Sequence, residues 1–283
     1  MRKVRPALLP GVPTLFVALL NHPDVRAGKI DFKSIKLCVS GGAPLLAEVK
    51  SRFETLTGGR MVEGYGLTES MMAAVITPLR GTYKPGSVGI PLPDVEVGIG
   101  DMDAGKGSLA PGKIGEILIR APQLMLGYWQ HPAETKETIR DGRLCTGDTG
   151  YLDKDGYLFI VDRKKDVIKP SGFQVWPREV EEVIVSHPAV SEVGVGGVRD
   201  EYQGEAVKAW IVLGPGQRAT AEEIRAFCRK KLTGYKVPKQ IEFVESLPKT
   251  IIGKVLRRAL VEKEKSERKA VIRERRDEVQ KSP

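Results

Sequence analysis

Residues 161–184, VDRKKDVIKPSGFQVWPREVEEVI, mark the place where the pattern of apolar, charged and glycine residues changes in this 283-residue sequence. Alternating charges come first, and a glycine turn follows at Gly172. Pro177 then opens a predicted helix, because proline suits the first helical position. That helix carries apolar residues on one side, as expected for packing on a core: Val180, Val183 and Ile184. We therefore place a domain boundary at the start of this stretch, between residues 162 and 163.

Before the boundary, from about Lys84 to Tyr157, glycine and proline are frequent and apolar residues alternate in short runs. Such runs predict strands over residues 95–99, 114–120 and 157–161. Asp155-Gly156 lies between two short apolar stretches and is a hairpin signal. This part is predicted to form a small β subdomain.

The segment before Lys84 alternates predicted strands with predicted helices. Residues 35–40 suit a buried strand, residues 45–56 a helix, and residues 61–70 a strand end that runs into a loop. Such alternation implies part of a layered α/β sheet. Residues 1–23 superficially resemble a signal peptide, but prolines interrupt the apolar stretch. We predict a core helix over residues 14–20, which is too short to span a bilayer.

After the boundary, strands are predicted over residues 190–198, 206–213 and 241–244. Thr220 and Glu223 form a capping box ahead of an amphipathic helix, and a last helix begins at about Val255. The predicted fold class is thus α/β followed by α+β. Residues 1–162 are predicted to form a layered α/β piece with a small β subdomain. Residues 163–265 are predicted to form a small α+β domain, and residues 266–283 a charged tail.

The net charge of +9 is concentrated in residues 225–258, which hold ten Lys or Arg and two acids, Glu242 and Glu245. A positive field of this kind attracts polyanions such as nucleotides, coenzyme A, nucleic acid and anionic lipid. A solvated helix face is the alternative reading. The three cysteines are far apart, which favours a reducing compartment, and each of the three histidines precedes a proline. We expect these histidines at turns or helix boundaries and not in a metal site.

Three loops carry residues that suit a nucleotide. SGGAPL, residues 40–45, permits close backbone approach to a flat ligand, because glycine has no side chain. In EGYGLTES, residues 63–70, Tyr65 could stack on a base, Thr68 could bond a phosphate oxygen and Glu69 could hold Mg²⁺. Asp148, in a TGD stretch, could accept both hydroxyls of a ribose. Alone, each loop is more often a structural turn.

Lys254 stands directly after Gly253 in PKTIIGKVLRR, residues 248–258. A flexible ammonium on such a loop can reach into another domain as a point charge. Read alone, it is one surface lysine among many. Other patterns fail: Asp101-x-Asp103 lacks the glycine and glutamate of a calcium loop, and no GxxxxGK[ST] phosphate loop occurs.

Taken together, in this order and spacing, these stretches resemble the adenylate-forming superfamily, which comprises acyl-CoA synthetases, luciferases and the adenylation domains of peptide synthetases. Within it, GVPTLFVALLNHP, LMLGYW, TGD, VDRKKD and LTGYKVPK are most similar to bacterial long-chain fatty-acid–CoA ligases. The resemblance covers the chain to about Lys265. It implies the carboxyl-terminal part of an enzyme that makes acyl-AMP from a fatty acid and ATP, then passes the acyl group to coenzyme A.

The resemblance implies a role for each motif residue. Thr68 and Glu69 serve the α-phosphate and Mg²⁺, and Lys254 clamps the carboxylate and α-phosphate; these three are the predicted catalytic residues. Lys165 falls where the family keeps the hinge between its large domain and its small mobile domain. Tyr65 stacks on adenine, Asp148 holds the ribose with Arg163 beside it, and Gly172 lines the pantetheine tunnel. Predicted binding positions also include Gly41, Gly42, Ala43 and Gly66.

The family's phosphate-binding loop is expected upstream of the first residue of this chain, with much of the acyl tunnel. One hypothesis is a truncated or split ligase that is inactive alone. A second is that another chain supplies the amino-terminal half, and a third is a non-catalytic basic binding module. Expected partners are a fatty acid, ATP and coenzyme A, and not nucleic acid. The expected location is the cytoplasm, with a peripheral contact to the inner face of the membrane left open.

Overall fold

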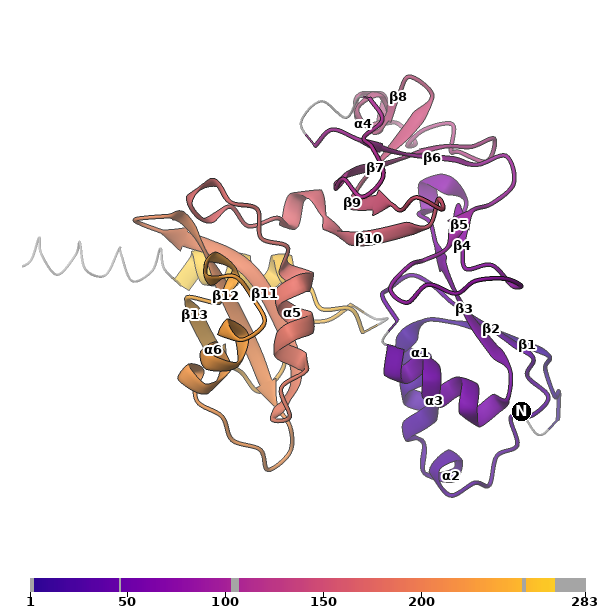
Figure 1. Ribbon diagram of the computed structural model, residues 1–283, viewed down its shortest axis with the longest axis horizontal. Helices are drawn as coiled ribbons and strands as arrows, with labels where there is room; N and C mark the ends of the chain where they lie inside the picture. Colours follow the sequence, from indigo (N-terminus) through magenta and orange to yellow (C-terminus); the bar gives the residue numbers. More distant parts are fainter. Residues whose placement is uncertain (1–2, 46, 103–106, 251–252, 268–283) are drawn as a thin grey trace, which may run out of the picture. The chain divides into compact units, whose positions relative to one another are not determined.

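The computed structural model describes residues 3–45, 47–102, 107–250 and 253–267 (Figure 1). The chain forms two compact units, Met1–Lys164 and Lys165–Pro283. Of the charged tail predicted for residues 266–283, only residues 266 and 267 belong to the described part. None of the described helices is both long and apolar enough to cross a membrane.

The first unit begins with a parallel sheet. Its strands run in the order β1 (Leu8–Gly11), β2 (Leu37–Ser40) and β3 (Arg60–Tyr65), and two short antiparallel strands extend it, β4 (Val75–Ile76) and β5 (Ile90–Pro91). Strand β1 was not predicted. Its Pro10 is tolerated because β1 is the outer strand of the sheet that the described residues form. The confirmed parallel pairing of β1, β2 and β3 is the layered α/β piece expected from the sequence.

Helices pack on this sheet through aromatic residues. They are α1 (Pro13–Asn21), α2 (Pro23–Arg26) and α3 (Ala47–Thr57). Phe16 of α1 meets Phe53 of α3 edge-on at 5.0 Å between ring centroids, and Phe32 meets Phe53 at 6.0 Å. All three rings are buried, as is Met61 of β3. The core helix predicted over residues 14–20 is thereby confirmed.

The rest of the first unit is an antiparallel sheet in the order β10-β9-β7-β6. Its strands are β6 (Glu96–Gly100), β7 (Gly115–Arg120), β9 (Arg143–Leu152) and β10 (Leu158–Arg163), with α4 (Pro132–Thr138) and β8 (Ile139–Arg140) beside β9. The hairpin predicted at Asp155-Gly156 joins β9 to β10. Ile117 and Ile119 of β7 and Leu158 of β10 are fully buried in its core.

The second unit is a three-stranded sheet covered on both faces. Strands β11 (Val190–Asp200) and β12 (Gly204–Leu213) are antiparallel, and β13 (Gln240–Phe243) runs parallel to β12. Because side chains alternate along a strand, Val207, Ala209 and Ile211 of β12 join one core and Ala206 and Trp210 the other. The first core packs against α5 (Pro177–Val185) and α6 (Ala221–Arg229), and the second against helical residues 257–267.

The capping box predicted at Thr220 is formed. Glu223 N donates to Thr220 Oγ1 at 3.2 Å, and Thr220 N donates to Glu223 Oε2 at 2.7 Å. The histidines also lie where they were predicted, since His22 separates α1 from α2, His131 precedes α4 and His187 follows α5. Short 3-10 helices complete the chain: η1 (Thr68–Ser70), η2 (Lys164–Asp166), η3 (Pro170–Gly172) and η4 (Gly234–Lys236).

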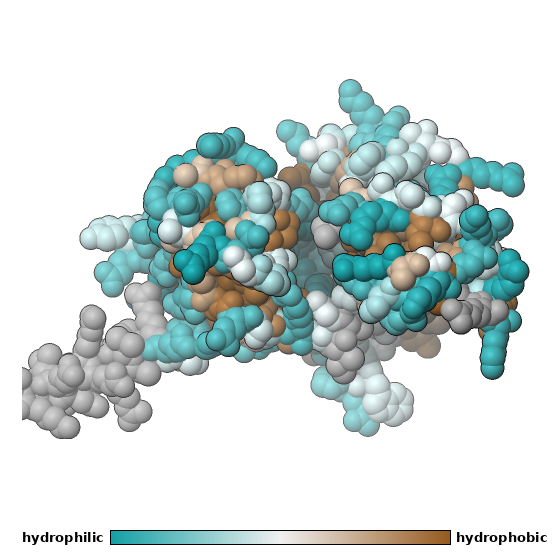
Figure 2. Space-filling model, turned by 90° about the horizontal axis from the view of Figure 1, so that it is seen from below, coloured by the Kyte–Doolittle hydropathy of each residue, from teal (hydrophilic) through white to brown (hydrophobic). Residues whose placement is uncertain are grey.

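Apolar side chains remain exposed on the first unit. Leu126 and Trp129 are almost fully exposed, as is Met72. Leu8 of the edge strand β1 is 51% exposed. Figure 2 shows apolar areas between hydrophilic side chains on the face that it displays.

Candidate functional site

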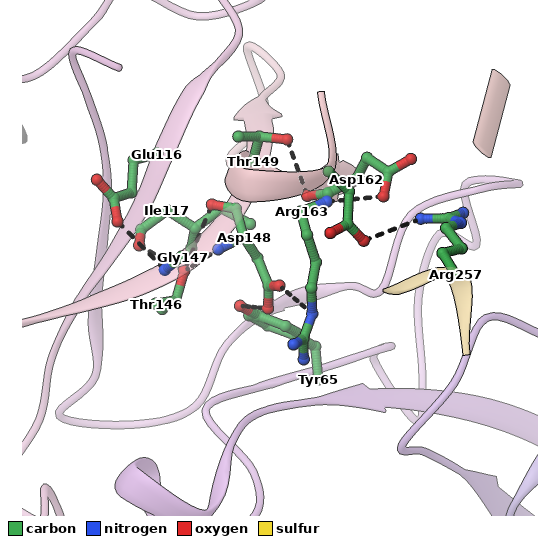
Figure 3. Close-up of polar contacts among 11 residues, drawn as sticks. Tyr65, Glu116, Ile117, Thr146, Gly147, Asp148, Thr149, Asp162, Arg163 and Arg257 are labelled. Atoms are coloured by element: carbon green, nitrogen blue, oxygen red, sulfur yellow. Dashed lines mark hydrogen bonds and ion pairs between the residues drawn. The ribbon is translucent and has the colours of Figure 1, made fainter. Parts of the chain in front are cut away.

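Tyr65 and Asp148 meet in the first unit although they come from different sheets (Figure 3). The Tyr65 hydroxyl donates to Asp148 Oδ2 at 2.9 Å. Tyr65 is the last residue of β3, and Asp148 lies within β9. Both residues are at least nine-tenths buried. The predicted adenine-stacking ring and the predicted ribose carboxylate are therefore neighbours.

A β-bulge aims Asp148 at Tyr65. The pairing of β7 with β9 shifts between Glu116 and Leu118, so Ile117 faces an extra loop of β9. Gly147 takes a φ of +69° in that loop, a left-handed conformation that glycine adopts without strain. The Thr146 hydroxyl donates to Ile117 O at 2.8 Å and accepts from Asp148 N at 3.1 Å. These bonds explain why the TGD stretch needs its threonine and its glycine.

A guanidinium lies on the other side of the carboxylate. Arg163 Nε is 3.4 Å from Asp148 Oδ1, and the Arg163 side chain is about half exposed. Thr149 and Asp162 hold this end of β10 in place, since the Thr149 hydroxyl donates to Asp162 O at 2.8 Å and Asp162 Oδ1 accepts from Arg163 N at 2.7 Å. One carboxylate oxygen of Asp148 thus contacts the phenol of Tyr65, and the other lies near the guanidinium of Arg163. Arg163 lies beside Asp148, where the resemblance led us to expect it.

The electrostatics keep Tyr65 protonated. Burial, followed by the neighbouring carboxylate of Asp148, raises the pKa of Tyr65 well above its usual value. The phenol donates its hydrogen bond to the carboxylate of Asp148. A carboxylate can accept several bonds on its two oxygens, and ribose hydroxyls are donors that it can accept from.

The loop after Tyr65 closes tightly on itself. Ala74 N donates to Tyr65 O at 2.9 Å, and Met72 N donates to Leu67 O at 3.0 Å. A Cβ on Gly66 would stand 2.0 Å from Met72 O, so only glycine fits there. This closure places Thr68 and Glu69 on η1, with the Thr68 side chain exposed.

Tyr128 contacts the predicted metal ligand. Its hydroxyl donates to Glu69 Oε1 at 2.6 Å, and Met125 N donates to Glu69 O at 2.8 Å. The LMLGYW stretch, residues 124–129, therefore supports η1. Sequence reasoning used this stretch only for its resemblance and did not single out Tyr128. An aromatic hydroxyl beside a loop motif was the available signal, but nothing in the sequence pairs residues 69 and 128.

The Glu69 carboxylate could bind Mg²⁺ only if phosphate oxygens supplied further ligands to the ion. Among the described residues, no group of three or more His, Cys, Asp or Glu could hold a metal ion. Mg²⁺ is commonly bound through one or two carboxylates together with substrate phosphates and water. One carboxylate on an accessible loop therefore fits a Mg²⁺ that arrives with a nucleotide.

SGGAPL lies at the carboxyl ends of the parallel strands. Ser40 ends β2 and pairs with Gly11 of β1 and Glu63 of β3. Ligands of open α/β sheets bind at this edge. Gly42 has a φ of +78°, and a Cβ on Gly41 would lie 3.4 Å from a carbonyl oxygen. Ala43 follows them and is half-buried.

Three predicted residues belong to the second unit. Lys165 is its first residue and lies exposed in η2. Gly172 ends η3 with a φ of +84°, after Ser171 with a φ of +50°. Lys254 is exposed on the turn before helical residues 257–267. Thus Tyr65, Asp148 and Arg163 are brought together within the first unit, whereas Lys165, Gly172 and Lys254 belong to the second.

The concentrated positive charge of residues 225–258 is largely neutralised in the fold. At least seven of its ten basic side chains contact acidic residues that lie outside the run in the described part of the chain: Arg225, Arg229, Lys236, Lys239, Lys249, Arg257 and Arg258. Lys236, for example, pairs with Glu179 of α5 at 2.7 Å. Charges paired in this way contribute little to a field that attracts polyanions. The basic run is thus weak support for a nucleic-acid module.

Two family models of AMP-binding enzymes match the chain, and its α/β fold agrees with them. The AMP-binding enzyme model matches residues 1–129, and the AMP-binding enzyme C-terminal domain model matches residues 179–254. The chain belongs to the AMP-binding enzymes. It is 48% identical over 262 residues to a long-chain-fatty-acid–CoA ligase of Bacillus subtilis, covering 93% of this chain and 46% of that protein.

Other similarities agree. A long-chain-fatty-acid–CoA ligase of Salmonella typhimurium is 47% identical over 250 residues, with 88% of this chain and 44% of that protein covered. The crystal structure of ATP-bound MatB from Rhodopseudomonas palustris superposes with a TM-score of 0.84 at 36% identity, over 92% of this chain and 51% of MatB. The chain spans about half the length of the relatives it matches.

Proposed function

We propose that this chain works in an ATP-dependent acyl-CoA synthetase that activates a long-chain fatty acid. The contact that carries the proposal is the hydrogen bond from Tyr65 to Asp148, because it joins the two groups expected to hold adenine and ribose. The relatives called long-chain-fatty-acid–CoA ligases support the choice of substrates. ATP, coenzyme A and a fatty acid are the proposed substrates, and the cytoplasm is the proposed location.

The proposed reaction has two steps. In the first, the fatty carboxylate attacks the α-phosphorus of ATP, which gives acyl-AMP and pyrophosphate. In the second, the coenzyme A thiol attacks the acyl group and AMP leaves. The second unit turns about Lys165 between the steps, and Gly172 then lines the path of the thiol.

Each residue has a proposed part in this reaction. Thr68 donates to an α-phosphate oxygen, and Glu69, oriented by Tyr128, would hold a Mg²⁺ that would neutralise phosphate charge. Lys254 meets the negative charge that develops at the α-phosphate, where a preorganised cation lowers the barrier most. Asp148 orients the ribose. Gly41, Gly42, Ala43 and Gly66 let backbone approach the flat groups closely.

Binding of a non-hydrolysable acyl-adenylate mimic, an acylsulfamoyl adenosine, tests the nucleotide site in this chain as it stands. We expect binding by calorimetry, and a loss of roughly tenfold or more in affinity on Asp148→Ala, since a good hydrogen-bonded contact is worth 1–2 kcal/mol. Asp94→Ala in the same unit is a control on an exposed turn. Equal binding by Asp148→Ala and the parent chain would reject the site.

Fatty-acid-dependent release of AMP tests the activity. The purified chain is assayed with ATP, Mg²⁺, coenzyme A and a long-chain fatty acid, alone and with the amino-terminal half of a long-chain ligase. The proposal expects acyl-CoA formation at least in the second mixture, with turnover lost in the absence of fatty acid. Turnover by the chain alone would reject the hypothesis that it is inactive without a partner.

A further inference from the structure

The turn that carries Lys254 is closed by hydrogen bonds. Thr250 N donates to Lys254 O and Gly253 N donates to Thr250 O, each at 2.8 Å, and Lys254 N donates to Thr250 Oγ1 at 3.1 Å. A bridge between Lys249 and Val255 lies at the base of the turn. These bonds tie the backbone of Gly253 and Lys254 to Thr250.

Arg257 holds the end of this turn through a two-pronged ion pair. Its Nε donates to Glu181 Oε1 at 2.8 Å and its Nη2 donates to Glu181 Oε2 at 2.5 Å. Both side chains are more than four-fifths buried. Paired bonds between a guanidinium and a carboxylate are among the strongest and most directional in proteins. Arg257 is thus held in one orientation.

The same guanidinium reaches the first segment of the second unit. Arg257 Nη1 lies 3.5 Å from Oδ2 of Asp166, which is in η2 directly after Lys165. Glu181 in turn accepts from Val195 N of β11 at 2.9 Å. One side chain therefore connects the Lys254 turn, the core helix α5 and the residue next to the proposed hinge.

A second ion pair near Lys254, between Lys249 and Glu192, is much more exposed to solvent than the pair between Arg257 and Glu181. Lys249 Nζ lies 2.7 Å from Glu192, but both side chains are more than a third exposed. Exposed pairs of this type contribute little, because solvent screens them and long side chains lose entropy. The buried fork of Arg257 is thus the main polar anchor of the turn.

We propose that Arg257 is a positioning residue that ties the backbone beside Lys254 to α5 and to Asp166, so that Lys254 keeps a fixed position relative to the residue that follows the hinge. The inference rests on the proposed function, which gives Lys254 its part in adenylation. The physical reason is distance: misplacing a reacting group by about 1 Å can slow a step by about 10²-fold. A lysine on a long flexible stem depends on its backbone for that accuracy.

Amide hydrogen exchange, followed by nuclear magnetic resonance on the 283-residue chain, tests the lock directly. We expect Arg257→Gln to speed exchange at Gly253, Lys254 and Leu256 by at least about tenfold and to leave β12 unchanged, because the opening is local. The matched control is Arg258→Gln, since Arg258 is 84% exposed and pairs with Glu262 one turn along the same helix. The control should change these rates less than about twofold.

Separate assays of the two half-reactions, with the amino-terminal half added where activity requires it, test the consequence. Arg257→Gln should lower ATP–pyrophosphate exchange by about 10²-fold and leave thioester formation from supplied acyl-AMP within about threefold. Arg257→Lys keeps the charge without the planar fork, so it should recover only part of the loss. A purely structural defect would slow both half-reactions together.

Two results would overturn the proposal: unchanged exchange at Lys254 in folded Arg257→Gln, or equal losses in both half-reactions. If Arg257→Gln fails to fold, Asp166→Asn replaces it, because that change keeps the paired bonds from Arg257 to Glu181 and removes only the η2 carboxylate charge that faces Arg257. It must then lower pyrophosphate exchange selectively. Normal pyrophosphate exchange in Lys254→Ala would reject the proposed function instead, and the exchange rates at the turn would still decide the role of Arg257.

Discussion

The Tyr65 phenol donates a 2.9 Å hydrogen bond to Asp148, a residue 83 positions further along the chain. This bond ties the end of the parallel sheet to a bulge in the antiparallel sheet. The two sheets of the first unit therefore share a polar contact at the candidate nucleotide site. Loss of that contact should affect both the stability of the unit and the geometry of the site.

Tyr65→Phe should lower the free energy of unfolding of the first unit by about 1.5–3 kcal/mol, because it removes a buried hydrogen bond to a charged acceptor. Urea denaturation followed by near-ultraviolet circular dichroism measures the change. Tyr151→Phe makes the same chemical change on a ring that stacks on Phe159, and it should alter stability by less than about 0.5 kcal/mol. Equal effects of the two substitutions would contradict the assigned bond.

Gly66→Ala should destabilise the first unit by about 1–3 kcal/mol and weaken binding of the acyl-adenylate mimic, because the new methyl group meets Met72 O. Gly64→Ala is the matched control, two residues earlier in the same stretch. Its Cβ would meet only an ordinary contact at 3.9 Å. Thermal denaturation and calorimetry compare the pair, and a tolerated Gly66→Ala would show that the loop closes differently.

Lys254→Ala should slow adenylation on the order of 10²–10³-fold, by analogy with the loss of a single preorganised donor. The reference pKa of lysine, about 10.4, keeps an ammonium cationic at neutral pH. ATP–pyrophosphate exchange in the complemented enzyme is the assay. Lys230→Ala, on an exposed lysine of the same basic run, serves as the control. A near-normal exchange rate would remove Lys254 from the mechanism.

Thr220→Ala should lower the free energy of unfolding of the second unit by about 1 kcal/mol, because it removes the oxygen that caps α6. Thr233→Ala is a useful comparison, since Thr233 precedes η4 and its side chain makes no capping bond. Denaturant titration of both variants gives the difference. A similar loss in both would mean that the capping bond contributes nothing measurable.

The second unit should lose stability in acid. The Lys239 ammonium, then backbone N–H donors, lower the pKa of Asp200, and the backbone N–H of Thr220 lowers the pKa of Glu223. A carboxyl whose pKa is lower in the folded state stabilises the fold above its unfolded pKa, and this contribution is lost as pH falls through the folded value. Melting temperatures should thus fall as pH drops below the ordinary carboxyl values of 4.5 and 3.8.

Asp200→Asn provides the control for this pH dependence. It removes one of the two carboxyls, so the variant should start less stable at neutral pH and lose less on acidification than the parent chain. The comparison is made on the second unit by following its two tryptophans, Trp176 and Trp210. A parallel decline in the variant and the parent would exclude a contribution from Asp200.

Local patterns predicted most of the regular structure. The helix at Pro177, the hairpin at Asp155-Gly156 and the capping box at Thr220 depend on residues that are neighbours in the chain. Strand β1 was missed because its proline is tolerated only at a sheet edge, and edge position depends on the rest of the sheet. The assigned roles of the site residues stay predictions until the experiments above are done.

The basic run of residues 225–258 shows a property that local patterns did not predict. Its composition predicted a strong positive field, yet acids from α5, β11, α6 and the last described helix pair with most of its side chains. Tyr128 was likewise not identified, because its partner Glu69 lies 59 residues away. Charge balance and side-chain partners depend on distant segments, which a local pattern does not contain.

The sequence by itself determined the family, the order of helices and strands and the motif residues, because these depend on residue type and short spacing. Only the tertiary structure decided which of those residues touch. It joined Tyr65 to Asp148 across two sheets and Arg257 to Glu181 and Asp166 within the second unit. The reason is that hydrogen bonds and ion pairs act over a few ångströms in space, and only folding brings distant parts of the chain that close.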